Sequence, residues 1–155
     1  MKSVAHFIFG LIILSFMGSS CATIVGGSKY HASVLVRDHP NAKISYQGLQ
    51  RGFGTAIFNV NRNQADKFSF TVKDGDCAEQ QFDFRSRTFR GWAFLGTLVT
   101  WTGVIGGVYI PWGATIDLID GALWKPNAKE PGVIKLDYKN YTYPVNYTGC
   151  SKAEQ

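Results

Sequence analysis

Residues that could act in catalysis are few in this sequence of 155 residues, and none falls in a recognised catalytic pattern. Beyond residue 20 the histidines are His31 and His39, which stand near a predicted tether and a predicted turn, where an imidazole is usually solvated. The sequence contains no Gly-x-Ser-x-Gly nucleophile elbow and no His-Glu-x-x-His zinc motif. The Gly-rich stretch 103–107 lacks the Lys-Ser/Thr pair that completes a phosphate-binding loop. We therefore predict a non-enzymatic protein with no catalytic residue, no metal site and no cofactor.

One pair of carboxylates leaves a different interpretation open. Asp117 and Asp120 stand at i,i+3 spacing, which places two side chains on one face of a helix. Paired carboxylates can act as acid and base, so a hydrolase acting on the cell wall is an alternative hypothesis. The simpler interpretation is that both aspartates cap or solvate the end of the apolar segment before them. Asp74 and Asp76, which flank a glycine, are more typical of a turn than of a calcium site.

The three cysteines offer thiol chemistry of two kinds. Cys21 follows an apolar N-terminal run, whereas Cys77 and Cys150 lie far apart in the rest of the chain. If Cys21 is modified, the other two remain as a pair, which in an oxidising compartment forms a disulfide. That bridge would close a loop of about 73 residues and would stabilise the fold by roughly 4 kcal/mol. Two separate buried thiols are the alternative.

The N-terminus has the order of an export signal. A positive charge at Lys2 precedes an apolar run at 7–17, and small residues at 18–20 lead to Cys21. The apolar run is shorter than the roughly 20 residues that span a bilayer. The stretch resembles a bacterial lipobox, in which lipid is attached to a cysteine and the chain is cut just before it, although Gly18 stands where Leu is typical. The resemblance implies that Cys21 is the lipid attachment site.

This interpretation predicts where in the cell the protein is located. Residues 1–20 would be a signal peptide and residues 21–31 a lipidated tether, so the membrane is the first expected partner. Ala22 stands where lipoproteins retained at the inner membrane carry Asp, which implies the periplasmic side of the outer membrane. An ordinary secretory signal that yields a soluble periplasmic protein remains open, as does an uncleaved N-terminal anchor.

The net charge of +5 is only mildly basic and does not indicate a protein that binds polyanions. The basic residues are scattered, with one cluster at Arg85, Arg87 and Arg90, in which Arg85-Ser86-Arg87 is most simply a solvated strand face. Contact of this cluster with anionic lipid head groups is a secondary hypothesis. We find no nucleic-acid motif and predict no nucleic-acid partner.

Residues 32–90 show the short alternating segments typical of antiparallel strands. The clearest is 67–73, in which Phe68, Phe70 and Val72 share one face. The Asp-Gly-Asp stretch after it predicts a hairpin. We predict an α+β fold, mainly β, with a small antiparallel sheet that has one buried face. The expected strands are 33–37, 42–46, 55–60, 67–73, 80–85, 133–138 and 141–147.

Residues 33–86 resemble the PEGA-type β-module. The resemblance rests on Pro40–Gly48, Gly52, Gly54-Thr55 and Phe70–Gly75. The chain departs from that pattern at Ala56, where Pro is usual, and at Asp76, where Tyr is usual. With its Cys-Ala-Thr-Ile stretch, the chain is similar to a group of small bacterial lipoproteins of unassigned function that carry a Gly-rich apolar segment. The resemblance implies a PEGA-like β-region over 32–90.

A Gly-rich apolar segment is present at 91–126, and it carries no charged side chain from Gly91 to Ile116. We expect it to be helical, packed on the sheet or on the membrane, with residues 127–155 completing the same domain. Insertion of 91–110 into the bilayer is the main alternative, because that length is just sufficient. A pair of buried strands is a third interpretation, and Pro111 argues against one continuous helix.

Four tryptophans could supply a sugar-stacking surface or an interfacial belt, although packing is the commoner role. They are Trp92, Trp101, Trp112 and Trp124. Taken together, the patterns predict a lipid-anchored cell-envelope protein with a structural or binding role. Its expected partner, besides the membrane, is another envelope protein or a glycan.

Overall fold

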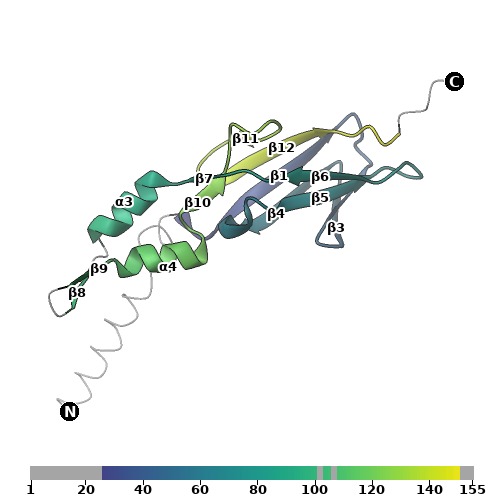
Figure 1. Ribbon diagram of the computed structural model, residues 1–155. Helices are drawn as coiled ribbons and strands as arrows, with labels where there is room; N and C mark the ends of the chain where they lie inside the picture. The colour runs from purple at the N-terminus through teal and green to yellow at the C-terminus, as the bar shows by residue number, and fades with distance from the viewer. Residues whose placement is uncertain (1–25, 101–102, 106–107, 151–155) are drawn as a thin grey trace, which may run out of the picture. The chain divides into compact units, whose positions relative to one another are not determined.

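The computed structural model describes residues 26–100, 103–105 and 108–150, which fall into two compact units (Figure 1). Lys29–Phe89 and residues 124–150 form the β-unit, whereas residues 26–28 and Arg90–Leu123 belong to the helical unit. The predicted signal peptide and the predicted lipid site Cys21 lie outside the described residues. At the level of fold class the prediction is confirmed, since strands dominate and helices α3 and α4 accompany them.

The β-unit is built on a sheet that has eight strands in the described residues, in the order β11-β12-β1-β4-β3-β2-β5-β6. Strands β7 and β10 form a separate two-stranded ladder, and a short 3-10 helix, η1, follows β4. The bounds are β1 (Lys29–Arg37), β2 (Lys43–Tyr46), β3 (Leu49–Phe53), β4 (Thr55–Asn61), η1 (Arg62–Gln64), β5 (Phe68–Lys73), β6 (Gln80–Phe84), β7 (Arg87–Phe89), β10 (Trp124–Pro126), β11 (Ile134–Lys135) and β12 (Asn140–Asn146).

One pairing in this sheet is parallel, which the predicted antiparallel sheet does not include. Strand β12 runs beside β1 in the same direction, from the pair His31 and Asn140 to the pair Arg37 and Asn146. Parallel neighbours need a long connection, and the chain between β1 and β12 supplies one. Two residue pairs join β12 to β11, and Pro144 lies beyond them on β12. The N–H that proline lacks is therefore not needed for the pairing with β11.

The core forms because the sheet curls until its two ends face each other. Along β4 the buried residues alternate strictly with exposed ones, as the period of a strand requires. The ring of Phe68 on β5 lies 4.8 Å from that of Tyr143 on β12 and 6.1 Å from that of Phe58 on β4. Since β5 and β12 are not neighbours in the sheet, these contacts show that strands from distant positions share one apolar interior.

The helical unit differs from the single helical stretch expected for 91–126. It contains α3 (Gly91–Thr100), a pair of strands β8 (Gly103–Ile105) and β9 (Val108–Ile110), and α4 (Trp112–Asp120). Pro111 precedes α4 and Gly121, with φ of 74°, ends it. The last residues of the predicted segment 91–126, Trp124–Pro126, form strand β10 of the β-unit. Residues 91–110 are therefore not one helix, and no described helix is long and apolar enough to cross a membrane.

Candidate functional site

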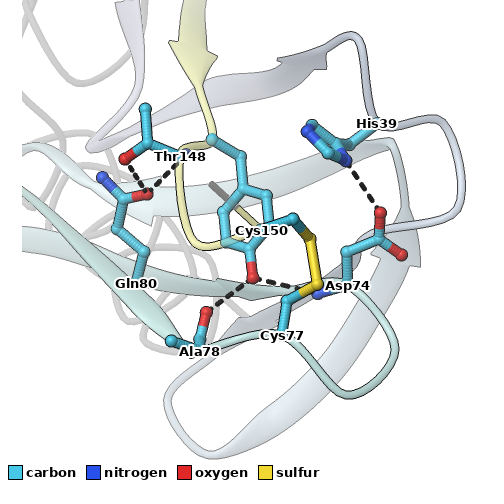
Figure 2. A network of polar contacts seen from close by, with 8 residues as sticks. His39, Asp74, Cys77, Ala78, Gln80, Thr148 and Cys150 are labelled. Atoms are coloured by element: carbon cyan, nitrogen blue, oxygen red, sulfur yellow. Dashed lines mark hydrogen bonds and ion pairs between the residues drawn. A yellow bond between two sulfur atoms is a disulfide. The ribbon is translucent and has the colours of Figure 1, made fainter. Parts of the chain in front are cut away.

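The predicted disulfide between Cys77 and Cys150 is confirmed, and the alternative of two separate thiols is wrong. The two Cα atoms lie 5.0 Å apart although the residues are separated by 73 positions. Cys77 follows the turn that ends β5, and Cys150 follows β12 (Figure 2). The bridge therefore joins the C-terminal end of the described chain to the β5–β6 hairpin.

An imidazole and a carboxylate lie beside the disulfide. His39, from the turn between β1 and β2, has its Nδ1 atom 2.8 Å from Oδ2 of Asp74, which follows β5. The His39 ring also meets the ring of Tyr147 edge to face, with centroids 5.0 Å apart. The expectation of a solvated His39 is therefore wrong, because its side chain is only 24% exposed and it has a carboxylate partner. No local pattern reveals this pair, since 35 positions separate its members.

Hydrogen bonds hold the segment after β12 against β6. The hydroxyl of Tyr147 donates to the carbonyl oxygen of Ala78 at 2.5 Å, and the backbone N–H of Ala78 donates to the carbonyl oxygen of Gly149 at 3.3 Å. The backbone N–H and the hydroxyl of Thr148 both donate to Oε1 of Gln80, at 3.0 and 3.3 Å (Figure 2). This region is a cross-linked corner, which we call the disulfide corner.

The disulfide corner brings three types of metal-ligating residue together. Ligand atoms of His39, Asp74 and Cys150 lie within 4.8 Å of one another. The sulfur of Cys150 is consumed by the disulfide, whereas a metal ion is bound by the thiolate. In the oxidised protein this leaves one imidazole and one carboxylate, fewer than the three protein ligands of a typical zinc site. The arrangement is best suited to fixing the C-terminal segment.

The two candidate acid–base residues, Asp117 and Asp120, differ in their exposure to solvent. Asp117 is fully buried in the helical unit, where its Oδ2 accepts a hydrogen bond from the hydroxyl of Thr97 at 2.6 Å. Asp120, at the end of α4, is exposed. The interpretation that both are solvated is thus wrong for Asp117, which links α4 to α3. The enclosed carboxylate gives no support to a hydrolase that uses this pair.

The arginine cluster also separates into different environments. Arg90 is 6% exposed and donates to the carbonyl oxygen of Ala122, so it is buried and lies on no solvated face. The Nε atom of Arg87 lies 3.3 Å from Oδ2 of Asp66, and its Cζ atom lies 4.2 Å from the centroid of the Trp124 ring. Arg85 is the member of the cluster that stays largely in solvent. These three residues therefore form no continuous basic patch.

A polar pocket of about 320 Å³ opens on the β-unit. It exists because the ladder between β3 and β4 contains a single residue pair, Phe53 with Thr55, so that the earlier residues of β3 and the later residues of β4 are not paired with each other. Residues from β1, the β2–β3 hairpin, β4 and η1 line it. They are Lys29, Tyr46, Gln47, Arg51, Ile57, Phe58, Asn59, Asn61 and Gln64. We call this the amide pocket.

The described residues that line the amide pocket carry positive charge and no carboxylate. Lys29 and Arg51 line it, and neither makes an ion pair within the residues that the structure describes. Burial raises the pKa of Tyr46, and the nearby Arg51 opposes that rise by favouring the phenolate. The sequence did not reveal this site because β3 has no strand pattern and the lining residues come from separate elements.

Apolar side chains are exposed on both helices of the helical unit. Trp92 is 88% exposed and Val99 is 84% exposed on α3, where Leu95 lies between them at the helical repeat. Trp112 and Ile119 are exposed on α4. Large exposed apolar side chains at helical spacing are typical of a surface that contacts another apolar phase.

Comparisons of the chain with known protein families, with curated proteins and with solved structures found no match.

Proposed function

We propose that the protein is exported, is anchored by a lipid on Cys21 at the periplasmic face of the outer membrane, and serves there as a non-enzymatic binding or structural protein. The observation that supports this most is the Cys77–Cys150 disulfide. Structural disulfides persist in oxidising compartments and are rare in the cytosol of most organisms. Together with the signal-like N-terminus, the bridge supports folding of the β-unit outside the cytoplasm.

A binding or structural role fits what the described residues offer. The acid–base pair expected for a hydrolase has one enclosed member, Asp117. The disulfide corner holds its imidazole and carboxylate against each other, beside a disulfide. The amide pocket, in contrast, presents unpaired cations and free amides at a concave surface. We interpret the β-unit as a PEGA-like module that displays this pocket while the lipid on Cys21 holds it at the membrane.

The anchor is tested by metabolic labelling with palmitate in a bacterium that processes lipoproteins. We expect label in the wild-type chain and its complete loss in a Cys21→Ser variant, which should also leave the membrane fraction. A Cys77→Ser variant is the matched control, since it removes a thiol without removing the lipid site. An unlabelled wild-type chain that fractionates with the soluble periplasm would contradict the proposal.

The exposed helical surface favours a second candidate role, contact of the helical unit with the bilayer. Trp92, Leu95 and Val99 would lie in the interfacial layer, where tryptophan is enriched. This differs from the alternative in which 91–110 inserts into the bilayer, because α3 ends at Thr100 and strands β8 and β9 follow.

Vesicle flotation of a chain that starts at residue 21 and carries Cys21→Ser tests this contact without the lipid. We expect flotation with vesicles that contain anionic lipid, and its loss when Trp92 and Val99 are both replaced by Ser. Leu136→Ser is the control, since this residue is 67% exposed on the β-unit. Equal flotation of the control and the double variant would contradict the role.

A further inference from the structure

We propose that the amide pocket binds an acidic saccharide, a sugar unit that carries a carboxylate, and that this is how the β-unit holds a glycan. The inference rests on the proposed binding role and names the class of ligand for it. Its volume of about 320 Å³ falls within the range of small-molecule sites, about 300–1,000 Å³.

Of the side-chain amides that line the pocket, Gln47 donates to the hydroxyl of Tyr46 at 3.3 Å, and the other three are available for a ligand. Asn59 and Asn61 lie on β4 at exposed positions, and Gln64 is exposed on η1. None of these three side chains makes a hydrogen bond within the described part of the chain. An amide presents a donor and an acceptor side by side, and neighbouring hydroxyls of a sugar present the complementary groups. A row of unpaired amides therefore suits a polyhydroxylated ligand.

The charge of the pocket selects an acidic ligand. Lys29 from β1 and Arg51 from β3 line it from different strands, and no acidic residue is among the described residues of its lining. Bonds from a cation to a carboxylate are roughly twice as strong as neutral ones, and the guanidinium fork of Arg51 matches a carboxylate in geometry. A neutral sugar would leave this charge uncompensated.

The wall of the pocket supplies a rigid apolar surface. The ring of Tyr46 is held against those of Phe58 and Phe68, with centroids 5.0 and 5.6 Å away. Ile57, which is 70% exposed on β4, lines the same pocket. The C–H face of a sugar ring packs on such surfaces, and residues fixed on strands need little ordering when a ligand binds. A bare anion would use the cations but not this wall.

Calorimetric titration of the oxidised chain that starts at residue 21 and carries Cys21→Ser tests the assignment. The probes are trigalacturonate, the neutral trisaccharide maltotriose and inorganic phosphate. We expect binding of trigalacturonate that weakens as salt screens the charges, and weaker or no binding of the other two. Arg51→Gln should raise Kd for trigalacturonate about tenfold, because a charged hydrogen bond is lost.

Two variants assign the effect to the pocket. Asn59→Ala should also weaken trigalacturonate binding, whereas Lys43→Gln, which removes an exposed charge from β2 outside the pocket lining, should leave it unchanged. Absence of trigalacturonate binding by the folded protein would overturn the proposal, as would equal weakening by Lys43→Gln. Binding of phosphate as tight as that of trigalacturonate would also overturn it in favour of a simple anion site. None of these results depends on palmitate labelling, so the proposal of a lipid anchor and the proposal of saccharide binding can be contradicted independently.

Discussion

Two buried tyrosines, Tyr30 and Tyr143, make the β-unit sensitive to alkaline pH. Burial raises the pKa of both phenols, and the hydroxyl of Tyr143 donates to that of Tyr30 at 3.5 Å. In the unfolded chain a tyrosine loses its proton near pH 10, whereas the folded protein keeps both protons above that pH. The stabilisation is therefore complete below about pH 10 and is lost as the pH rises further.

We expect the free energy of unfolding to fall above about pH 10 by roughly 1.4 kcal/mol per pH unit for each buried tyrosine. Urea unfolding between about pH 8 and pH 11 measures the slope. Tyr30→Phe should reduce the slope, and Tyr138→Phe, at a site 43% exposed, should not. A slope unaffected by Tyr30→Phe would contradict this account.

Arg62 is a fully buried cation that ties η1 to two later segments. Its Nη2 donates to the carbonyl oxygen of Tyr138 at 3.2 Å and its Nη1 to that of Trp124 at 3.5 Å. Burial lowers the pKa of Arg62, and the nearby Tyr141 opposes that shift. An arginine nevertheless stays protonated in proteins, so the charge must be satisfied by these partners.

Replacement of Arg62 by Lys should destabilise the β-unit by about 2–3 kcal/mol, because an ammonium group cannot present the same fork to two carbonyl groups. Chemical unfolding measures the loss, with Arg51→Lys as the exposed control. Equal stability of the two variants would show that the guanidinium fork of Arg62 is not needed for the stability of the β-unit.

Among the elements, the hairpin of β5 and β6 depends most on the disulfide corner. Loss of the Cys77–Cys150 bridge should lower the free energy of unfolding by roughly 4 kcal/mol, since the loop that it closes is long. A Cys77→Ala, Cys150→Ala double variant, compared with Cys21→Ser in urea unfolding, measures this. A loss below about 1 kcal/mol would mean that the hydrogen bonds of the corner suffice without the covalent link.

Local patterns predicted the elements whose side chains alternate. The segment 67–73 and the turn at Asp74 predicted the hairpin of β5 and β6, and strands β2, β4 and β12 lie close to their predicted bounds. Strand β1 begins at Lys29, earlier than the predicted start at residue 33, so the end of the predicted tether 21–31 is part of the sheet. Strand β3 was missed because four of its five residues are exposed, so it has no buried face to detect. The parallel pairing of β1 with β12 was missed because it depends on contacts between distant segments.

The candidate sites were less predictable than the strands for the same reason. The spacing of Cys77 and Cys150 allowed a disulfide, but the position of His39 beside it follows from the three-dimensional arrangement of two turns. The two aspartates of α4 share a helix, yet packing of α3 encloses Asp117 and leaves Asp120 in solvent. Burial of a polar side chain cannot be read from spacing alone.

At the scale of the whole molecule, the segment Arg90–Leu123 is an insertion into the β-unit. Its flanking residues, Phe89 on β7 and Trp124 on β10, are paired in an antiparallel ladder. The main apolar cluster of the β-unit contains none of the residues of this insertion that the structure describes. Both observations indicate that the β-unit has the contacts to fold without it.

We therefore expect that replacement of Arg90–Leu123 by Asn-Gly leaves a folded β-unit, because this dipeptide forms the tight turn that joins two paired strands. The shortened chain, starting at residue 21 with Cys21→Ser, should retain the disulfide and unfold cooperatively. Mass analysis without reductant and circular dichroism during urea unfolding test both points. A non-cooperative transition would show that the β-unit needs the insertion.

The pairing of β1 with β12 sets the timing of maturation. Strand β1 has no partner on one side until β12 has been delivered, and Cys77 cannot form its disulfide until Cys150 is present. Contacts between such remote segments form late and slowly. In a polypeptide secreted from its N-terminus, the core could thus close only after β12 had crossed the membrane, and the chain before it would stay unfolded until then, as threading through a translocation channel requires.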